Sequence, residues 1–291
     1  MLGGRRLSLS ARAFAMPVLT PLVMLATITL GSVAGVVGTL LGLGGGVFLV
    51  PFLVLVLGMP FQAAAAISLT TVIATSSAVS GAAAGRQLIN LRLGMLLEVA
   101  TAAGGLLGGI TAQVLAPSTL RKLFSAVAVL AAIMVLGRLR HSNFLIGDDP
   151  DPGALGGQYH DERLGRVVTY RFKRMPLALA ASFVAGNVSS LLGVGGGFIK
   201  VPVLNAWCGV PMRAAAATSA FMIGVTASAG AVIYYGRGTL VPAYAAAAVV
   251  GVQIGSRLGL RIAARLNGLW LRILLVIVLF AVAAMMYTGA R

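Results

Sequence analysis

The sequence predicts an all-α polytopic membrane protein with about eight transmembrane helices, arranged as two duplicated halves that each contain a glycine-broken, re-entrant short helix. Composition supports the first part of this prediction: 59% of the 291 residues are hydrophobic and only 10% are charged, whereas soluble domains carry about 25% charged residues. Apolar stretches of about 20 residues, the length that crosses a bilayer core, recur along the chain. A glycine-rich segment that occurs twice supports the second part.

Most of the apolar stretches are long enough to cross the membrane. They cover about residues 16–41, 60–84, 93–116, 119–137, 175–199, 211–235, 239–263 and 267–288. Two further stretches, 47–58 and 201–210, are too short and occupy matching positions in the two halves. The first stretch follows Arg5, Arg6 and Arg12 and has no convincing cleavage site, so we predict a retained span with a cytoplasmic basic flank.

The glycine-rich segment is repeated at a constant offset. Residues 34–51 read AGVVGTLLGLGGGVFLVP and residues 185–202 read AGNVSSLLGVGGGFIKVP. The offset from Gly42 to Gly193 is 193 − 42 = 151 residues. The same offset relates later pairs: Pro51 and Pro202, Ser68 and Ser219, Arg121 and Arg272. A glycine break duplicated inside apolar sequence is typical of membrane transporters.

The two halves, residues 1–139 and 175–291, are joined by a polar segment, 140–174, whose composition predicts a flexible cytoplasmic linker. If the short helices dip in and return, the halves share one orientation; if they cross, the halves are inverted. The positive-inside rule favours eight spans with the N-terminus inside, but this arrangement leaves an arginine row, Arg257 to Arg265, outside. Such a row indicates either a snorkelling helix end or a cationic funnel for an anion.

The glycine breaks expose backbone within the membrane. Three consecutive glycines interrupt the helix in each copy: Gly44, Gly45 and Gly46 in the first, and Gly195, Gly196 and Gly197 in the second. Since unsatisfied backbone groups are costly in lipid, such backbone is expected to line a cavity or to be buried in protein. A short helix then begins near Val47 and near Phe198, and its first amides carry partial positive charge. Two such termini facing each other would form an anion site; without a ligand they would be tight glycine crossings.

Polar side chains near the breaks extend the candidate substrate site. Lys200 follows the second break, where the first copy has Leu49. An intramembrane lysine indicates function by default, the alternative being a side chain that snorkels to the interface. Hydroxyl groups can donate to sulfonate-like or carboxylate-like oxygens, or bond their own helix. Beside the glycines and Lys200, the candidate site therefore contains Asn187, Ser68, Thr71 and Ser219.

The sequence argues against other classes of function. The net charge of +16 does not indicate nucleic-acid binding, because Lys and Arg lie mostly at the ends of apolar stretches. Cys208 alone makes no disulfide or multi-cysteine metal site, and His141 and His160 match no ligand spacing. We therefore predict no enzyme activity, no metal and no cofactor. The expected partners are a small anionic substrate and the lipid bilayer, and a homo-oligomer is left open.

The segments GLGGGVFLVP and GVGGGFIKVP, each followed by Gly-x-Pro and an alanine-rich span, resemble the TauE/SafE family of membrane permeases, also called the sulfite exporter family. The resemblance covers both halves of the chain. It implies a multi-pass plasma-membrane transporter, typically of eight spans, for sulfite, sulfonates or related small organic acids. The linker is longer than the short connection that the resemblance implies.

Glu98 is the single carboxylate in the apolar stretches, which contain no histidine. It lies six residues after Arg92, near an expected interface, where it would pair with a nearby base. Moving one negative charge outward gains about 2.3 kcal/mol per 100 mV of inside-negative potential. With few groups to carry protons, we expect export of the anion. The alternatives are proton-coupled uptake, in which Glu98 would carry the proton, and a non-transporting assembly role.

Overall fold

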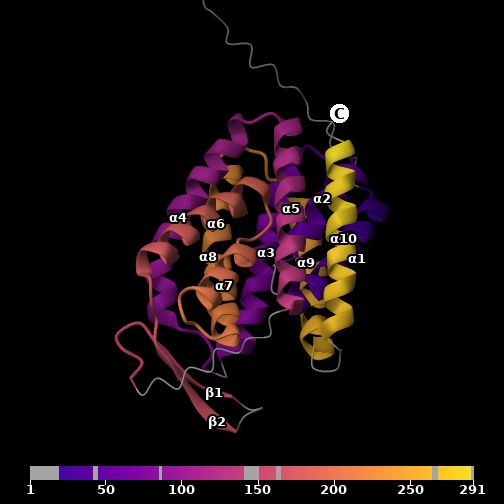
Figure 1. The fold of residues 1–291 in the computed structure, drawn as a ribbon. Coiled ribbons are helices and arrows are strands. Elements are labelled where there is room, and N and C mark those ends of the chain that lie inside the picture. The colour runs from indigo at the N-terminus through magenta and orange to yellow at the C-terminus, as the bar shows by residue number, and fades with distance from the viewer. Residues whose placement is uncertain are drawn as a thin grey trace, which may run out of the picture.

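A computed structural model describes residues 20–41, 45–84, 87–140, 151–161, 165–263 and 268–289, which form a bundle of ten helices with a β-hairpin at one end (Figure 1). The helices before the hairpin are α1 (Pro21–Leu41), α2 (Gly46–Leu55), α3 (Phe61–Ala84), α4 (Leu91–Val114) and α5 (Pro117–Arg140). The hairpin consists of β1 (Gly157–Asp161) and β2 (Arg166–Tyr170). The helices after it are α6 (Met175–Leu192), α7 (Gly197–Ala206), α8 (Met212–Gly236), α9 (Pro242–Ala263) and α10 (Gly268–Thr288).

The helices confirm the prediction of a helical, multi-pass membrane protein. In the described part of the chain, seven helices are long and apolar enough to cross a bilayer: α1, α3, α4, α5, α6, α8 and α9. α10 has 21 residues, of which Val276–Thr288 count as a shorter apolar helix. These eight helices correspond to the eight long apolar stretches. The two short stretches form α2 and α7, which have 10 residues each.

The short helices run back toward the end of the bundle at which their own half begins. The end of α2 at Leu55 lies close to Gly289, which follows α10, and Gly289 accepts a hydrogen bond from Arg121 at the start of α5. After α7, the carbonyl of Cys208 accepts a hydrogen bond from the amide of Lys173, just before α6. Figure 1 shows the C-terminal end and the hairpin at opposite ends of the bundle. The two halves therefore run in opposite directions.

This direction corrects the arrangement favoured from the sequence. α1 runs parallel to α9, since its residues meet those of α9 in increasing order along both helices. The start of α1 at Pro21 therefore lies at the end of the bundle opposite the hairpin. The first span thus begins on the side of the membrane opposite the linker hairpin. Length alone could not decide this, because a short apolar helix fits a chain that turns back as well as one that crosses.

Rows of glycines bring helices of the two halves into backbone contact. Gly251 and Gly255 of α9 lie against α1, and Gly104 and Gly108 of α4 lie against α6. A Cβ at any of the four would overlap a carbonyl oxygen of the partner helix. Small residues four apart allow such close approach in lipid, where van der Waals packing replaces the hydrophobic drive. These glycine rows therefore serve helix packing.

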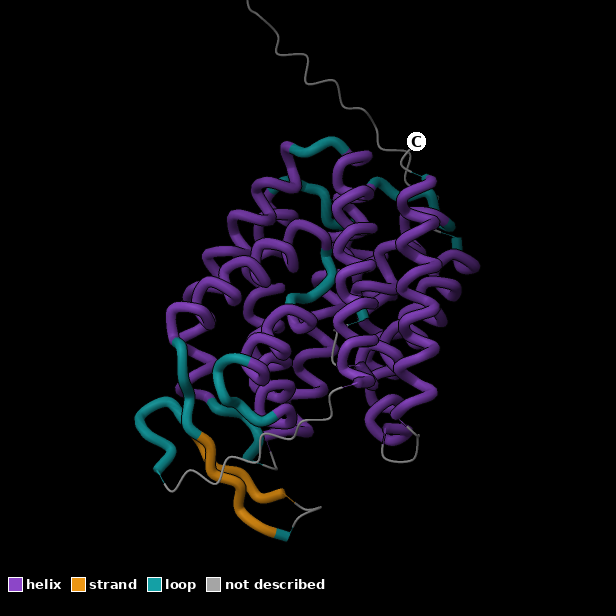
Figure 2. Tube along the Cα trace, viewed as in Figure 1, coloured by secondary structure: helices purple, strands orange, loops and turns teal. Residues whose placement is uncertain are grey.

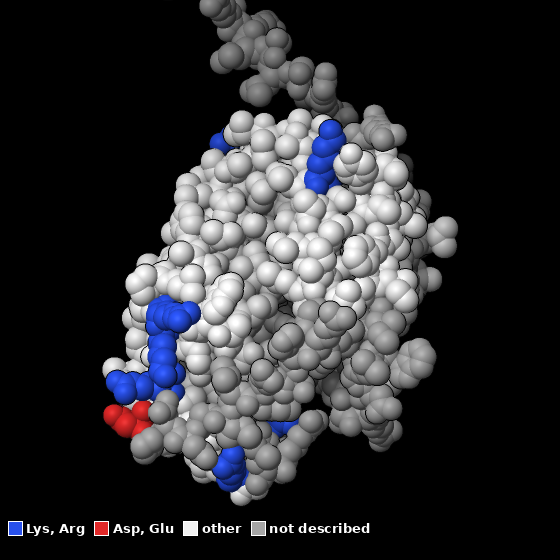
Figure 3. All heavy atoms as spheres, in the orientation of Figure 1, with Lys and Arg blue, Asp and Glu red and all other residues white. Residues whose placement is uncertain are grey.

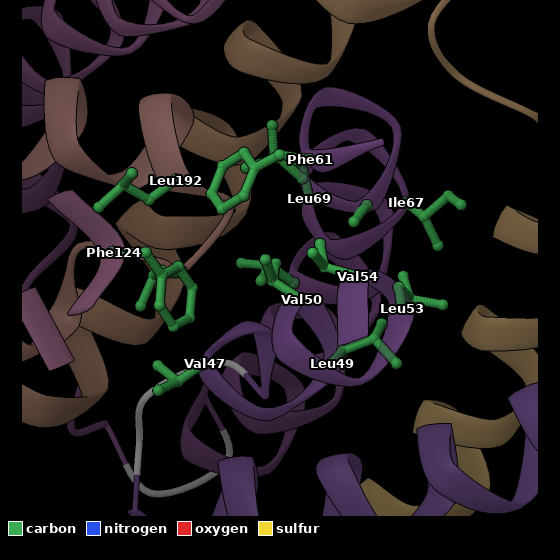
Figure 4. Packing of buried hydrophobic residues seen from close by; sticks show 14 of the residues in the cluster. Val47, Leu49, Val50, Leu53, Val54, Phe61, Ile67, Leu69, Phe124 and Leu192 are labelled. Atoms are coloured by element: carbon green, nitrogen blue, oxygen red, sulfur yellow. The ribbon is translucent and has the colours of Figure 1, made fainter. Parts of the chain in front are cut away.

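The short helix α2 is buried on nearly all sides. Figure 4 shows its Val50 and Leu53 among side chains of α3, α5 and α6. Phe61 of α3 and Phe124 of α5 meet edge to face, with ring centroids 6.1 Å apart. A helix that is apolar all round is expected where protein surrounds it. The interior therefore accommodates a helix that is too short to span the bilayer.

The linker contains a structured hairpin where the composition predicts a flexible segment. β1 and β2 pair antiparallel, with Tyr159 opposite Val168. Tyr159, Val168 and Tyr170 are buried in a cluster with Leu93 and Leu97 of α4. Burial raises the pKa of the Tyr170 phenol. The alternation of apolar and polar residues in the strands overrides the polar average, because one face of the hairpin packs on the helix bundle.

Asn90 fastens this hairpin to the bundle. Its Oδ1 accepts a hydrogen bond from the Leu93 amide and caps α4, and its amide group donates to the Leu155 and Gly156 carbonyls and to the Tyr170 hydroxyl. Asn90→Asp keeps the cap and removes the donors, and leaving partly buried acceptors unpaired costs about 1–3 kcal/mol. We expect faster proteolysis of the hairpin and a lower melting temperature. Gln158→Ala, at an exposed position on β1, is the control. Equal protease resistance in Asn90→Asp and the wild type would contradict this role.

Candidate functional site

Both short helices begin immediately after the glycine breaks, as the sequence predicts. Gly45 and Gly195 have φ values of +72° and +75°, in the left-handed region that favours glycine. α2 then begins at Gly46 and α7 at Gly197. Figure 2 shows loop segments lying between helices within the depth of the bundle. Gly44 lies outside the described residues.

The two breaks meet inside the protein. A Cβ on Gly46 would overlap the carbonyl oxygen of Gly193 and come within 2.5 Å of Ser68 Oγ. Ser68 donates a hydrogen bond to that carbonyl at 2.6 Å, and Thr71 donates to the Ser68 carbonyl at 2.7 Å. The breaks are therefore close-packed at this contact, and these two hydroxyls bond backbone oxygens. Of the predicted site residues, Gly46 and Ser68 lie together here.

Lys200 lies in the first turn of α7 and is only 1% exposed. Its Nζ lies 3.5 Å from Thr226 Oγ1 on α8. The Lys200 ammonium has three N–H donors, and Thr226 is its one hydrogen-bond partner in the described part of the chain. The side chain of Lys200 is thus directed into the bundle and does not snorkel to the membrane interface. A buried ammonium with donors to spare can bind an anion.

Glu98 lies close to Lys200 through Thr226. Its Oε1 accepts a hydrogen bond from Thr226 Oγ1 at 2.8 Å, and its Oε2 accepts one from Thr101 Oγ1 at 3.2 Å. The carboxylate is 8% exposed, so it is buried in the bundle rather than paired with a base at the interface. The network brings together α4, α7 and α8. Glu98, which the sequence places near an interface as a possible proton carrier, and Thr226, which the sequence-based prediction of the site does not include, are central to it.

A signal for Thr226 was present in the repeat. Thr226 is Thr75 + 151, and it occupies on α8 the position that Thr75 occupies on α3. At the same offset, Lys200 corresponds to Leu49 and Glu98 to Val249. The three positions that correspond to this network at the same offset therefore contain a threonine but no charged residue.

Other predicted residues take different places. Ser219 is buried, and its hydroxyl has no hydrogen-bond partner among the described residues. Asn187 lies on α6, where its backbone packs against Gly104 and Gly108 of α4. Gly196 packs against the carbonyl of Ala185 within the same half. The structure thus gives Asn187 a packing role through its backbone and leaves Ser219 as a buried hydroxyl without a partner.

The charged network carries the chemistry of ion binding. It combines an ammonium, a carboxylate and two hydroxyls in an apolar interior. In the described ranges, no group of three or more His, Cys, Asp or Glu side chains could hold a metal ion. Cys208 is a buried free cysteine among apolar side chains.

Comparison with known proteins identifies the family. The family model described as "Sulfite exporter TauE/SafE" matches residues 27–286. The chain belongs to this family. It is also 27% identical over 241 residues to a protein of Bacillus subtilis (strain 168) described as "Probable membrane transporter protein YunE", a match that covers 80% of this chain and 85% of that protein. No solved structure matches the chain.

Membership of the TauE/SafE family confirms the resemblance read from the glycine-rich segments. It makes the protein a multi-pass membrane transporter and not an enzyme. The match begins within α1 and ends within α10, so it covers both glycine breaks, the charged network and the hairpin. The substrate is a separate question, which depends on the site.

Proposed function

We propose that the protein carries a small anion, namely sulfite, an organosulfonate or a related organic acid, and that Lys200 binds it. The observation that carries this proposal is the burial of Lys200 beside Thr226, its one hydrogen-bond partner among the described residues, which leaves donors for a ligand. The N-terminus of α7 adds partial positive charge. Ile199 and Lys200 are the first residues whose amides bond back to the Gly196 carbonyl, so the amides before them have no partner within the helix. Sulfonate and sulfite oxygens are acceptors that suit both kinds of donor.

The distribution of basic side chains supports a cytoplasmic hairpin end. The described residues place these basic side chains at the hairpin end: Arg92, Arg166, Arg171, Lys173, Arg174, Arg213, Arg257 and Arg261. The opposite end has Arg121, Lys122 and Arg237. On the face drawn in Figure 3, basic side chains likewise gather mainly near the hairpin. By the positive-inside rule the hairpin faces the cytoplasm, and Arg257 and Arg261 then lie on the side where such residues are common.

Export is the direction expected for an anion that moves alone, because an inside-negative potential drives negative charge outward. The sequence favours export because its apolar stretches contain few groups that could carry protons, and it places the single carboxylate, Glu98, near an interface. The structure instead buries Glu98 and bonds it to Thr226 and Thr101. This observation favours the proton-coupled alternative over uncoupled passage. The buried ammonium of Lys200 argues against an assembly role without transport, because such a role does not require a buried charge.

A thermal-shift screen of the purified protein tests this proposal. Sulfite, methanesulfonate, isethionate, sulfate and acetate are added separately, with chloride at equal ionic strength as the control. A ligand present at about 100 times its Kd stabilises the native state by about 2.7 kcal/mol. We expect a sulfite or sulfonate to raise the melting temperature more than chloride does. If none of the five anions exceeds chloride, the proposed substrate class is wrong.

A further inference from the structure

The hydroxyl of Thr226 lies between one donor, Lys200, and two acceptors that compete for its proton. It is 2.8 Å from Glu98 Oε1, 2.9 Å from the carbonyl oxygen of Met222 and 3.5 Å from Lys200 Nζ. A threonine hydroxyl has one proton to donate and two lone pairs to accept with. It can therefore donate to Glu98 or to Met222, but not fully to both at once.

Two hydrogen-bond arrangements fit these distances. With Glu98 ionised, Lys200 donates to Thr226, Thr226 donates to Glu98, and the buried positive and negative charges balance. With Glu98 protonated, the carboxylic acid donates to Thr226 Oγ1, and the hydroxyl turns to the Met222 carbonyl in the preceding turn of its own helix. In the second arrangement Lys200 has no negative partner. The proton on Glu98 thus decides whether the ammonium is available to another anion.

The surroundings of Glu98 leave Lys200 as the charge that governs it. α6, which packs along α4, has no ionisable side chain between Met175 and Leu192. α8 has Arg213 in its first turn and two tyrosines in its last, all away from Thr226. On α4 itself, Arg92 lies about two turns earlier, and Tyr159 and Tyr170 of the hairpin pack at that same end.

A second anion cannot join this network without compensation. A bound anion and an ionised Glu98 would place two negative charges against one ammonium in an apolar interior, and uncompensated buried charge is strongly unfavourable. A proton on Glu98 restores neutrality and uses the second arrangement of Thr226. From this geometry we infer that Glu98 takes up one proton when an anion binds at Lys200, so that the protein moves the anion and the proton together.

This inference rests on the proposed function, and it adds the coupling ion and the stoichiometry. Thr226 acts as a positioning residue that passes the state of Glu98 to Lys200. A singly charged anion and one proton carry no net charge, so the membrane potential does not drive their joint movement. The direction of net transport then follows the concentration gradients of the anion and the proton.

Binding measured over a series of pH values tests the inference. The probes are methanesulfonate and isethionate, which stay singly charged near neutral pH, whereas sulfite takes up a proton itself. Titration calorimetry of the full-length protein in detergent gives Kd at each pH, and buffers of different ionisation enthalpy give the number of protons taken up. When Glu98 is ionised in the free protein, one proton per anion weakens binding about tenfold for each unit of pH increase.

Variants separate coupling from folding. Glu98→Gln, a neutral analogue of the protonated acid, is expected to bind the anion with no proton uptake and with a Kd that does not depend on pH. Thr226→Ser keeps the hydroxyl and is expected to keep the wild-type slope, whereas Thr226→Val is expected to flatten it. If Glu98→Gln does not fold, the two Thr226 variants still test the relay.

Three outcomes overturn the inference, and they are distinguishable. Wild-type protein that binds a sulfonate without proton uptake at any pH contradicts the coupling but leaves the proposed anion site intact. Failure of every anion to bind contradicts the proposed function, and the inference falls with it. A wild-type slope that persists in Glu98→Gln would assign the proton to a different group.

Discussion

Replacing Gly46 by alanine is expected to destabilise the protein by about 3 kcal/mol, the upper end of the usual cost of overpacking. The added methyl group would overlap the carbonyl oxygen of Gly193 and approach Ser68 Oγ. The carbonyl belongs to the backbone of the other break, so it cannot move aside as a flexible side chain would. Separating the breaks would also stretch the hydrogen bond from Ser68 to Gly193.

The melting temperature of the purified variant in detergent, with its elution profile in size-exclusion chromatography, measures this effect. Gly81→Ala on α3 is the matched control, because a Cβ at Gly81 has nothing within 4 Å. Ser68→Ala separates the loss of the hydrogen bond, about 1 kcal/mol, from the steric effect. If the Gly46→Ala and Gly81→Ala proteins have the same melting temperature, the two breaks do not meet as described.

The sequence specified this contact in part. Three glycines inside an apolar run can hardly continue a helix, so the starts of α2 at Gly46 and of α7 at Gly197 followed from local chemistry. The glycines spaced four apart on α4 and α9 likewise suit close helix packing, because they carry no side chain. The glycine pattern does not show which segment each glycine surface contacts. That Gly46 meets Gly193, and not its own copy at Gly197, depends on how the halves are oriented.

The charged network was beyond the reach of local patterns. Thr226 and Glu98 are 128 residues apart and come from different halves. Position along the chain suggested an interface for Glu98, because Arg92 lies near it, whereas packing of α4 against α8 buries the carboxylate. The hairpin was missed for a different reason: a polar average concealed the alternation that buries Tyr159 and Val168. In each case a tertiary contact decides the environment of a residue whose local sequence suggests another.

Replacing Lys200 by leucine is expected to have the largest effect on function and a large effect on stability. Without the ammonium, Glu98 would remain buried with hydroxyl partners but no positive charge, and breaking a buried pair from one side costs about 3–5 kcal/mol. Under the proposed function, the variant also loses the group that binds the anion. Both the melting temperature and its rise with added sulfite or sulfonate are therefore expected to fall. Lys173→Leu, at an exposed position outside the helices, is the control.

A double variant separates these two losses. Lys200→Leu combined with Glu98→Gln removes both charges, so the network becomes neutral and much of the lost stability should return, as replacing a buried pair with uncharged groups is often nearly neutral. Stabilisation by anions should not return, because the ammonium is still absent. Recovery of stability without anion binding would assign Lys200 to the substrate and Glu98 to charge balance. Recovery of both would mean that the anion binds elsewhere, whereas recovery of neither would mean that Lys200 holds the helices together through contacts other than its charge.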